Sequence, residues 1–164
     1  MSIRLGALLV FLLLAMSTQT VSAHCEMPCG IYGDEQRMET LSEDIATIEK
    51  SMQQIVALSQ DEEVNYNQLV RWVMTKETHA EYIQDIVFQY FMTQRVKPVD
   101  PADTDAYDAY VAQLTTLHRM VVEAMKTKQT TDLKHVEALR ELLSSFKAMY
   151  FGETLPAHEH DHGR

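Results

Sequence analysis

The chain has 164 residues, of which 14 are Lys or Arg and 24 are Asp or Glu, so its formal net charge at pH 7 is −10. This acidic balance argues against nucleic acid and against an anionic membrane surface as partners. With only two cysteines, the chain is not a small scaffold built on disulfides, and its length is typical of one domain with a real core.

The first 23 residues have the pattern of a secretory signal peptide. Arg4 forms a short basic region, residues 5–16 are an apolar run of 12 residues, and Val21-Ser22-Ala23 places small residues before a cleavage point. The apolar run is shorter than the about 20 residues that a membrane span needs; an uncleaved membrane anchor is the alternative. Cleavage after Ala23 would leave 141 of the 164 residues, change the net charge from −10 to −11 by removing Arg4, and make His24 the amino terminus.

The rest of the chain predicts four amphipathic helices and no strand. A turn at Gly33-Asp34, with Asp34 as a candidate N-cap, should precede the first helix. The second helix is expected from about Glu62 to Thr93, and the segment 96–101, with prolines at 98 and 101, is expected to be a connector. Four such helices with short joins indicate an all-α fold, an antiparallel up-down four-helix bundle.

The apolar residues that recur at helical spacing are the expected core. They are Met38, Leu41, Ile45, Ile48, Met52 and Ile55 in the first helix; Leu69, Trp72, Val73, Tyr82, Ile83, Ile86, Val87, Tyr90 and Phe91 in the second; Tyr107, Tyr110, Val111, Leu114, Leu117, Val121 and Met125 in the third; and Leu133, Val136, Leu139, Leu143 and Phe146 in the fourth.

The chain therefore divides into a cleaved signal peptide (1–23), an N-terminal segment that we call the hook (24–32), a four-helix bundle (33–151) and a tail (152–164). The tail has nothing to bury and should be disordered without metal. Its alternating His158, His160 and His162 could hold a divalent metal loosely and deliver it to the hook, or the tail could be merely solvated.

The hook, His24-Cys25-Glu26-Met27-Pro28-Cys29-Gly30-Ile31-Tyr32, holds both cysteines of the chain. Once residue 24 is the amino terminus, it offers an α-amine and an imidazole, Cys25 offers its peptide nitrogen and thiolate, and Cys29 returns at the Pro28 turn with a second thiolate. Two nitrogens and two sulfurs in a square, with the imidazole axial, suit nickel or copper better than zinc. Such strong donors stabilise a higher oxidation state, so the site should be redox-active.

A Cys25–Cys29 disulfide is the alternative in an oxidising compartment, but it explains neither the histidine at the cleavage point nor the proline turn. His118 and His135 have no partner at metal-ligand spacing and are expected at surface or satisfied bundle positions. The ten methionines are expected mostly as core filler.

The segment HCEMPCGIY resembles the nickel hook of nickel-containing superoxide dismutases, whose mature chains begin His-Cys-x-x-Pro-Cys-Gly-x-Tyr. The likeness plausibly extends from residue 24 to about residue 151. It implies a homohexamer of four-helix bundles, with one nickel ion per subunit, that converts two superoxide anions and two protons into O₂ and H₂O₂ by Ni(III)/Ni(II) cycling.

The resemblance also implies residue roles. His24 would give its amine and imidazole, Cys25 its amide nitrogen and thiolate, and Cys29 the second thiolate. Pro28 would take the cis bond of the family, Gly30 would permit the tight return, and Tyr32 would sit over the metal and restrict access to small anions.

The sequence departs from the family pattern at three residues, Glu26, Met27 and His79, and the match of the family carboxylate below needs one residue to be missing between Tyr32 and Arg37. Glu26 replaces a common Asp, and Met27 replaces Leu. The carboxylate that supports the axial histidine falls on Glu39, and the arginine that completes this support falls on His79. Because the charge of a histidine depends on pH, we expect weaker axial ligation above pH ~7.

The sequence thus predicts an exported superoxide dismutase, periplasmic or secreted, that is activated when signal peptidase frees His24 and has no membrane partner afterwards. The alternatives are a non-enzymatic exported nickel or copper carrier, and a structural helical oligomer with an incidental disulfide. Steering of superoxide to so acidic a protein would need local positive charges such as Arg37 or Lys50.

Overall fold

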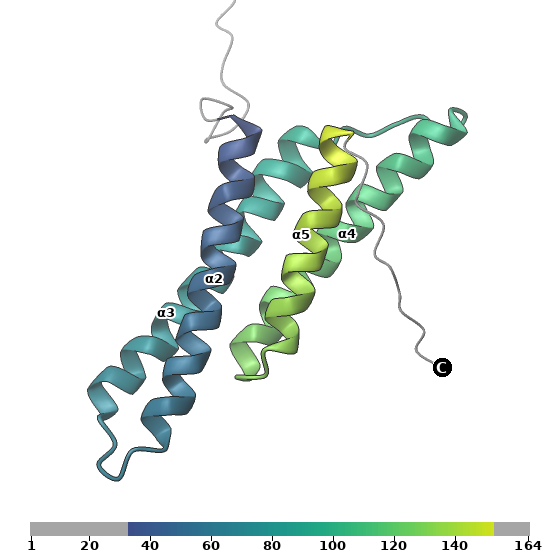
Figure 1. Ribbon diagram of the computed structural model, residues 1–164. Coiled ribbons are helices and arrows are strands. Elements are labelled where there is room, and N and C mark those ends of the chain that lie inside the picture. The colour runs from purple at the N-terminus through teal and green to yellow at the C-terminus, as the bar shows by residue number, and fades with distance from the viewer. Residues whose placement is uncertain (1–32, 153–164) are drawn as a thin grey trace, which may run out of the picture.

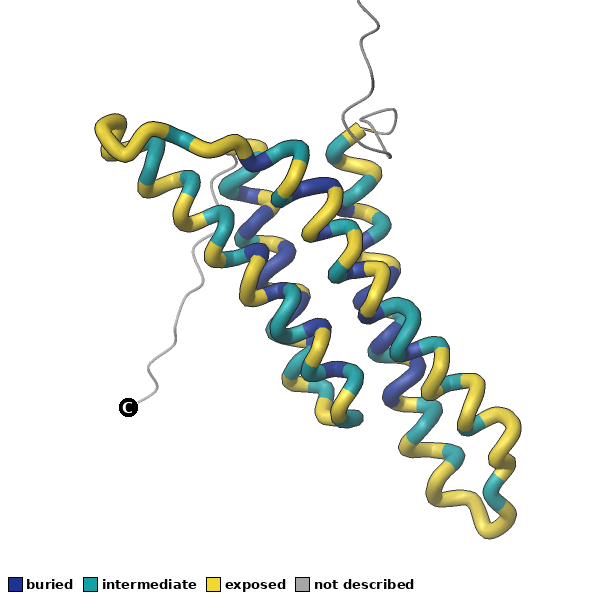
Figure 2. Tube along the Cα trace, turned by 180° about the vertical axis from the view of Figure 1, so that it is seen from behind, coloured by how far each residue is buried: buried dark blue, intermediate teal, exposed yellow. Residues whose placement is uncertain are grey.

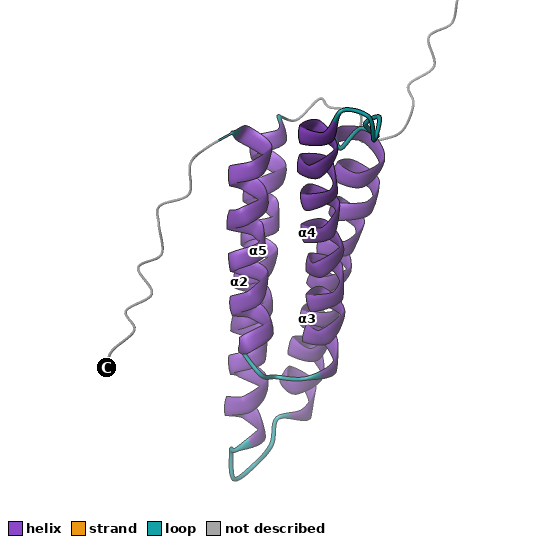
Figure 3. Cartoon of the chain, turned by 90° about the vertical axis from the view of Figure 1, so that its right-hand side faces the viewer, coloured by secondary structure: helices purple, strands orange, loops and turns teal. Residues whose placement is uncertain are grey.

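The computed structural model describes residues 33–152, and all the regular structure in this range is helical. The elements are α2 (Asp34–Ser59), α3 (Tyr66–Asp85), η1 (Ile86–Arg95), α4 (Thr104–Gln129) and α5 (Lys134–Phe151). Consecutive helices pack against each other, and α5 also packs against α2, so that four long rods lie side by side (Figure 3). The predicted all-α four-helix bundle is confirmed.

The core of the bundle follows the predicted stripes of the first and last helices. Met38, Leu41, Ile45, Ile48 and Met52 of α2 are buried, as are Val136, Leu139, Leu143 and Phe146 of α5. Buried positions face the interior along each rod, and exposed positions face outward (Figure 2). Helical spacing of apolar residues was therefore a sufficient guide for these two helices.

The third stripe is shifted relative to the prediction. The buried residues of α4 are Leu117, Met120, Ala124 and Thr127, whereas the predicted Met125 is exposed. The observed row keeps a spacing of 3, 4 and 3 residues and so stays on one face of the helix. The predicted row runs from Leu117 to Val121 and Met125 in successive steps of four, and such steps drift around a helix with 3.6 residues per turn. The small Ala124 and polar Thr127 gave no apolar signal.

The second predicted helix differs from the prediction at both ends. It begins at Tyr66, behind Asn65, whose side chain caps it by accepting a hydrogen bond from the Gln68 amide at 3.2 Å. Its last ten residues, η1, wind as a π-helix instead of an α-helix. The predicted core residues Val73 and Tyr82 are exposed.

The start of α2, the end of η1 and the end of α5 lie at the same end of the bundle (Figure 1). At the opposite end, the α2–α3 hairpin extends beyond the α4–α5 turn, as Figures 1 and 3 both show. No helix within residues 33–152 is long and apolar enough to cross a membrane. The predicted signal peptide, hook and tail lie outside the described residues, so their boundaries stay predictions.

Candidate metal centre and its surroundings

The predicted hook residues His24, Cys25, Pro28, Cys29, Gly30 and Tyr32 lie outside the described part of the chain. The structure does describe the point at which the hook joins the bundle, because α2 begins at Asp34, two residues after Tyr32. An extended chain spans at most about 3.6 Å per residue, so Cys29 lies within about 18 Å of Asp34.

The Asp34 side chain does not cap its own helix, contrary to the prediction. The N-cap is Gly33, which has no side-chain capping bond. Instead, Asp34 Oδ1 accepts a hydrogen bond from the Tyr90 hydroxyl at 2.5 Å, and Oδ2 accepts one from the Tyr150 hydroxyl at 2.8 Å. Arg95 Nε lies 2.9 Å from Oδ1 and completes an ion pair. The carboxylate therefore ties the start of α2 to η1 and to α5.

These contacts set the acidity of the groups involved. Burial alone would raise the pKa of Asp34, but the hydrogen bonds from Tyr90 and Tyr150 and the charge of Arg95 outweigh it, so the pKa lies below its ordinary value. Burial and the adjacent carboxylate raise the pKa of both tyrosine hydroxyls, most strongly that of Tyr150. Asp34 is therefore an ionised acceptor, and both tyrosines are donors, at neutral pH.

The π-helix explains how Arg95 reaches Tyr90. In an α-helix, residues five apart point in directions about 140° apart, whereas i to i+5 bonding brings them back toward one side. The Val96 amide accordingly donates to the Phe91 carbonyl at 2.8 Å, and Arg95 Nη2 donates to the Tyr90 hydroxyl at 2.9 Å. The guanidiniums of Arg37 and Arg95 both lie over the Tyr90 ring, 5.2 and 4.8 Å from its centroid.

Two positive charges therefore lie at the end of the bundle that the hook joins, and one of them is Arg37. The other predicted candidate, Lys50, lies over the Trp72 ring, 5.8 Å from its centroid. It is 16 residues beyond Asp34, or about 24 Å along α2 at 1.5 Å per residue. Only Arg37 of the two predicted residues is placed near the hook.

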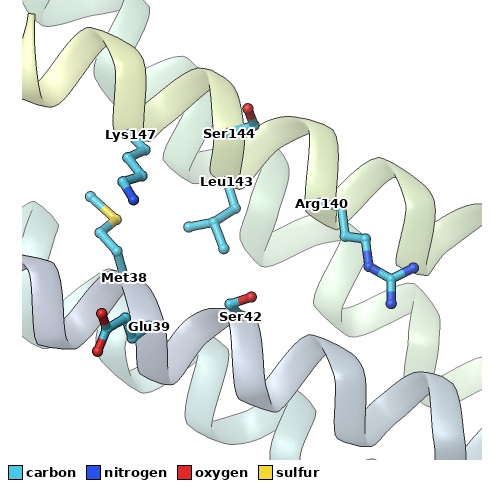
Figure 4. Close-up of a pocket in the computed structure, with 7 residues that line it drawn as sticks. All are labelled: Met38, Glu39, Ser42, Arg140, Leu143, Ser144 and Lys147. Carbon is cyan, nitrogen blue, oxygen red and sulfur yellow. The ribbon is translucent and has the colours of Figure 1, made fainter. Parts of the chain in front are cut away.

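Glu39 lines a pocket of about 350 Å³ between α2 and α5. Met38, Glu39 and Ser42 come from α2, and Arg140, Leu143, Ser144 and Lys147 come from α5 (Figure 4). The opposite wall thus carries two cations, of which Arg140 lies away from Glu39 and pairs with Glu49 (Figure 4). The pocket begins little more than one turn from the start of α2, so Glu39 is near the hook in sequence and near the point where the hook joins the bundle.

His79 contacts a different carboxylate from the predicted one. Its Nδ1 lies 2.7 Å from Asp44 Oδ1, and the His79 ring stands edge-on to Tyr82 with centroids 5.4 Å apart. Asp44 is buried, and burial raises its pKa even though the hydrogen bond and charge of His79 oppose the rise. Within residues 33–152, no hydrogen bond or ion pair joins Glu39 to His79, so the structure does not bring these two predicted residues together.

The other histidines predicted to be structural have that character. His118 is exposed, and His135 Nδ1 lies 2.6 Å from Glu123 Oε2, in a pair that joins α5 to α4. Lys126 donates to the other oxygen of Glu123 at 2.7 Å. In the described part of the chain, no three His, Cys, Asp or Glu side chains cluster so as to hold a metal ion.

The donor set of the hook fits nickel. If His24 becomes the amino terminus, as the sequence predicts, the hook would offer an amine, a peptide nitrogen, an imidazole and two thiolates within six residues, and first-row metals late in the series favour nitrogen and sulfur ligands of this kind. Binding would require deprotonated thiolates, so loading is expected to release protons.

A helical bundle that follows an amino-terminal segment of nitrogen and sulfur donors defines a metalloprotein class. The family model described as nickel-containing superoxide dismutase matches residues 19–154, and the chain belongs to this family. Searches of curated proteins and of solved structures found no match. Family membership makes the protein a nickel-dependent oxidoreductase that acts on superoxide.

Proposed function

We propose that this nickel superoxide dismutase builds its metal site from His24, Cys25 and Cys29, and that the site forms only after cleavage behind Ala23. The family match, which covers the hook and the whole bundle, carries the proposal. It is supported by the signal-peptide pattern of residues 1–23. Export to the periplasm or beyond the cell follows from that pattern, with signal peptidase as the maturation enzyme.

Nickel supplies the one-electron chemistry, which takes an electron from one superoxide and gives it to another. The chain has to bind and orient the metal through His24, Cys25 and Cys29. The Pro28 turn and Gly30 shape the return of the chain, and Tyr32 restricts the site to small anions. In this proposal, Glu39 and His79 would support the imidazole of His24 from outside the ligand set.

Steering of the anionic substrate is assigned to the cations beside the hook. Superoxide approaches a protein of net charge −10, so attraction must be local. Arg37 lies at the end of the bundle where α2 begins, with its guanidinium 5.2 Å from the centroid of the Tyr90 ring. The charge of Arg95, which also lies over this ring, is paired with Asp34. Arg37→Gln should lower the second-order rate, and the loss should shrink as ionic strength rises.

We also propose that the protein assembles as a homo-oligomer, a hexamer by the family resemblance. An exposed apolar stripe on the first half of α3 supports assembly: Tyr66, Val70 and Met74 are 71%, 54% and 63% exposed. These residues follow one another at intervals of four, so they share one helix face. Contiguous apolar surface of this kind marks interaction sites, and analytical ultracentrifugation of Met74→Glu would test it against the wild type.

The decisive experiment compares the wild-type protein with Cys29→Ser after expression with its leader. Mass spectrometry of the mature protein should place His24 at the amino terminus, and metal analysis should find nickel. Superoxide decay should be fast for the wild type and close to the uncatalysed rate for the variant. Nickel without dismutation would favour a carrier, and a metal-free protein with a 25–29 disulfide would contradict the proposal.

A further inference from the structure

Four side chains from three helical elements meet where the hook joins the bundle. We call Asp34 of α2, Tyr90 and Arg95 of η1 and Tyr150 of α5 the Asp34 clamp. Three contacts within it converge on the Asp34 carboxylate, at 2.5 to 2.9 Å, and Arg95 also donates to the Tyr90 hydroxyl at 2.9 Å. Both carboxylate oxygens are engaged, so the first residue of α2 is fixed from two sides.

We propose that the Asp34 clamp positions the hook for nickel binding. The clamp holds the residue from which the hook extends, and the nearest metal ligand, Cys29, is only five residues away. Fixing Asp34 therefore limits where the two thiolates and the amine can lie relative to the bundle. The four residues act through the chain and are positioning residues.

The way the carboxylate is used separates this role from ordinary helix capping. An acidic residue at a helix start normally satisfies amides of its own first turn. Asp34 instead accepts from side chains that lie 56 and 116 residues away in the sequence. Its contacts thus fix the place of the helix start and do little for the helix itself.

The π-helix points the same way. Long π-helical segments are rare, and π turns are frequent at functional sites. Here the wide turn is what places Arg95 beside Tyr90, with Nη2 to Oη at 2.9 Å, and lets Arg95 Nε reach Asp34. A regular α-helix over residues 86–95 would direct the two side chains to different faces, and the clamp would lose its cation.

The matched variants are Asp34→Asn and Arg95→Gln, with Glu49→Gln as the control. Asp34→Asn keeps the shape of the side chain and removes its charge. Arg95→Gln leaves the hydrogen bonds of both tyrosines to Asp34 in place, so it tests the clamp even if the first variant folds poorly. Glu49→Gln breaks the Glu49–Arg140 ion pair, which also joins α2 to α5 but lies four turns further along α2.

The readouts are nickel affinity, from competition with a chelator, and amide hydrogen exchange of residues 25–33 in the nickel-loaded protein. Outer residues that orient metal ligands typically contribute 10–100-fold to metal affinity. We expect about a tenfold or greater loss of nickel affinity in both clamp variants, with faster exchange across the hook. Neither quantity should change in Glu49→Gln.

The proposal would be overturned if both clamp variants kept the nickel affinity of the wild type and its rate of amide hydrogen exchange in the hook. Equal losses in the clamp variants and in Glu49→Gln would also overturn it, because the clamp would then contribute only to bundle stability. Urea unfolding of the apo proteins, measured in parallel, compares the stability of the three variants.

Discussion

Asp44 Oδ1 and His79 Nδ1 lie 2.7 Å apart, in a partly buried pair that joins α2 to α3. The second carboxylate oxygen, Oδ2, is buried with no hydrogen-bond partner in the described part of the chain. Asp44 lines a pocket of about 270 Å³ together with Arg37 and Tyr82. The carboxylate is thus only half satisfied, which is consistent with the raised pKa of Asp44.

The free energy of unfolding of Asp44→Asn, relative to that of the wild type, should therefore increase as pH rises. The folded pKa of Asp44 is raised above the ordinary value of 3.8, so the folded state holds the proton more tightly than the unfolded state does. Its contribution to stability is complete below the unfolded pKa and is lost as pH rises through the folded pKa. Urea unfolding from pH 4 to pH 7 should show that the stability of the variant increases relative to that of the wild type. A constant difference, or one that shrinks with pH, would contradict this.

Asp34→Asn should show the opposite dependence. The folded pKa of Asp34 is lowered, so its contribution is present above the unfolded pKa and is lost as pH falls through the folded pKa. We expect a loss of about 1–2 kcal/mol in the free energy of unfolding at pH 7, from charge-assisted hydrogen bonds. Variant and wild type should converge as pH falls through the folded pKa of Asp34. Persistence of the full difference below that pKa would count against an ionised carboxylate.

Lys76→Met should destabilise the bundle strongly. The buried ammonium donates to the Thr127 and Lys128 carbonyls at 2.8 and 2.6 Å, at the C-terminal end of α4. Removing it leaves helix-terminal carbonyls unsatisfied, at a cost of about 2–3 kcal/mol. The control Lys128→Met removes the more exposed Lys128–Glu81 pair and should cost less than about 1 kcal/mol. If the two variants lost equal stability in thermal unfolding, Lys76 would not be the residue that caps the C-terminal end of α4.

The pH dependence of catalysis tests the role proposed for His79. If this histidine replaces the supporting arginine of the family, the dismutation rate should fall as pH rises from 6 to 8.5. His79→Arg, which stays charged, should flatten the profile. A wild-type profile that is already flat would remove the role and leave His79 as a structural partner of Asp44.

The helical bundle could be predicted because its signal is repeated. Six apolar residues of α2 at intervals of three and four agree with one another, so a single misplaced residue, such as the half-buried Ile55, does not matter. In α4 the core row includes Ala124 and Thr127. Neither residue is hydrophobic enough to define a stripe, and the prediction moved to larger neighbours.

The nickel cofactor could be predicted because the hook motif is local, with its donors within six residues of one another; the roles of the individual hook residues stay predictions. The Asp34 clamp could not be predicted, because its members are brought together only by the fold. A local signal for the π-helix did exist. The apolar residues Phe91 and Val96, both of which are buried, are five residues apart, and this spacing fits a turn with i to i+5 bonds better than an α-helix with 3.6 residues per turn. The Asn65 cap was also visible in sequence, directly before the apolar run of α3.

The partners of Glu39 and His79 show where the resemblance stops being informative. The family pattern assigns the two residues to one supporting network, yet within the described chain they serve different contacts, one at the α2–α5 pocket and one at Asp44. Side-chain partners depend on which helix faces meet, and helix spacing alone does not give this.

The proposed metal site requires the amine of His24, and this requirement can be tested by leaving one extra residue in front of His24. Superoxide decay should be measured for nickel-treated protein that begins at His24 and for the same protein with Ala23 retained, both shown by far-UV circular dichroism to be folded. The account predicts that the extra residue abolishes catalysis while the bundle stays intact. Equal rates for the two proteins would contradict it.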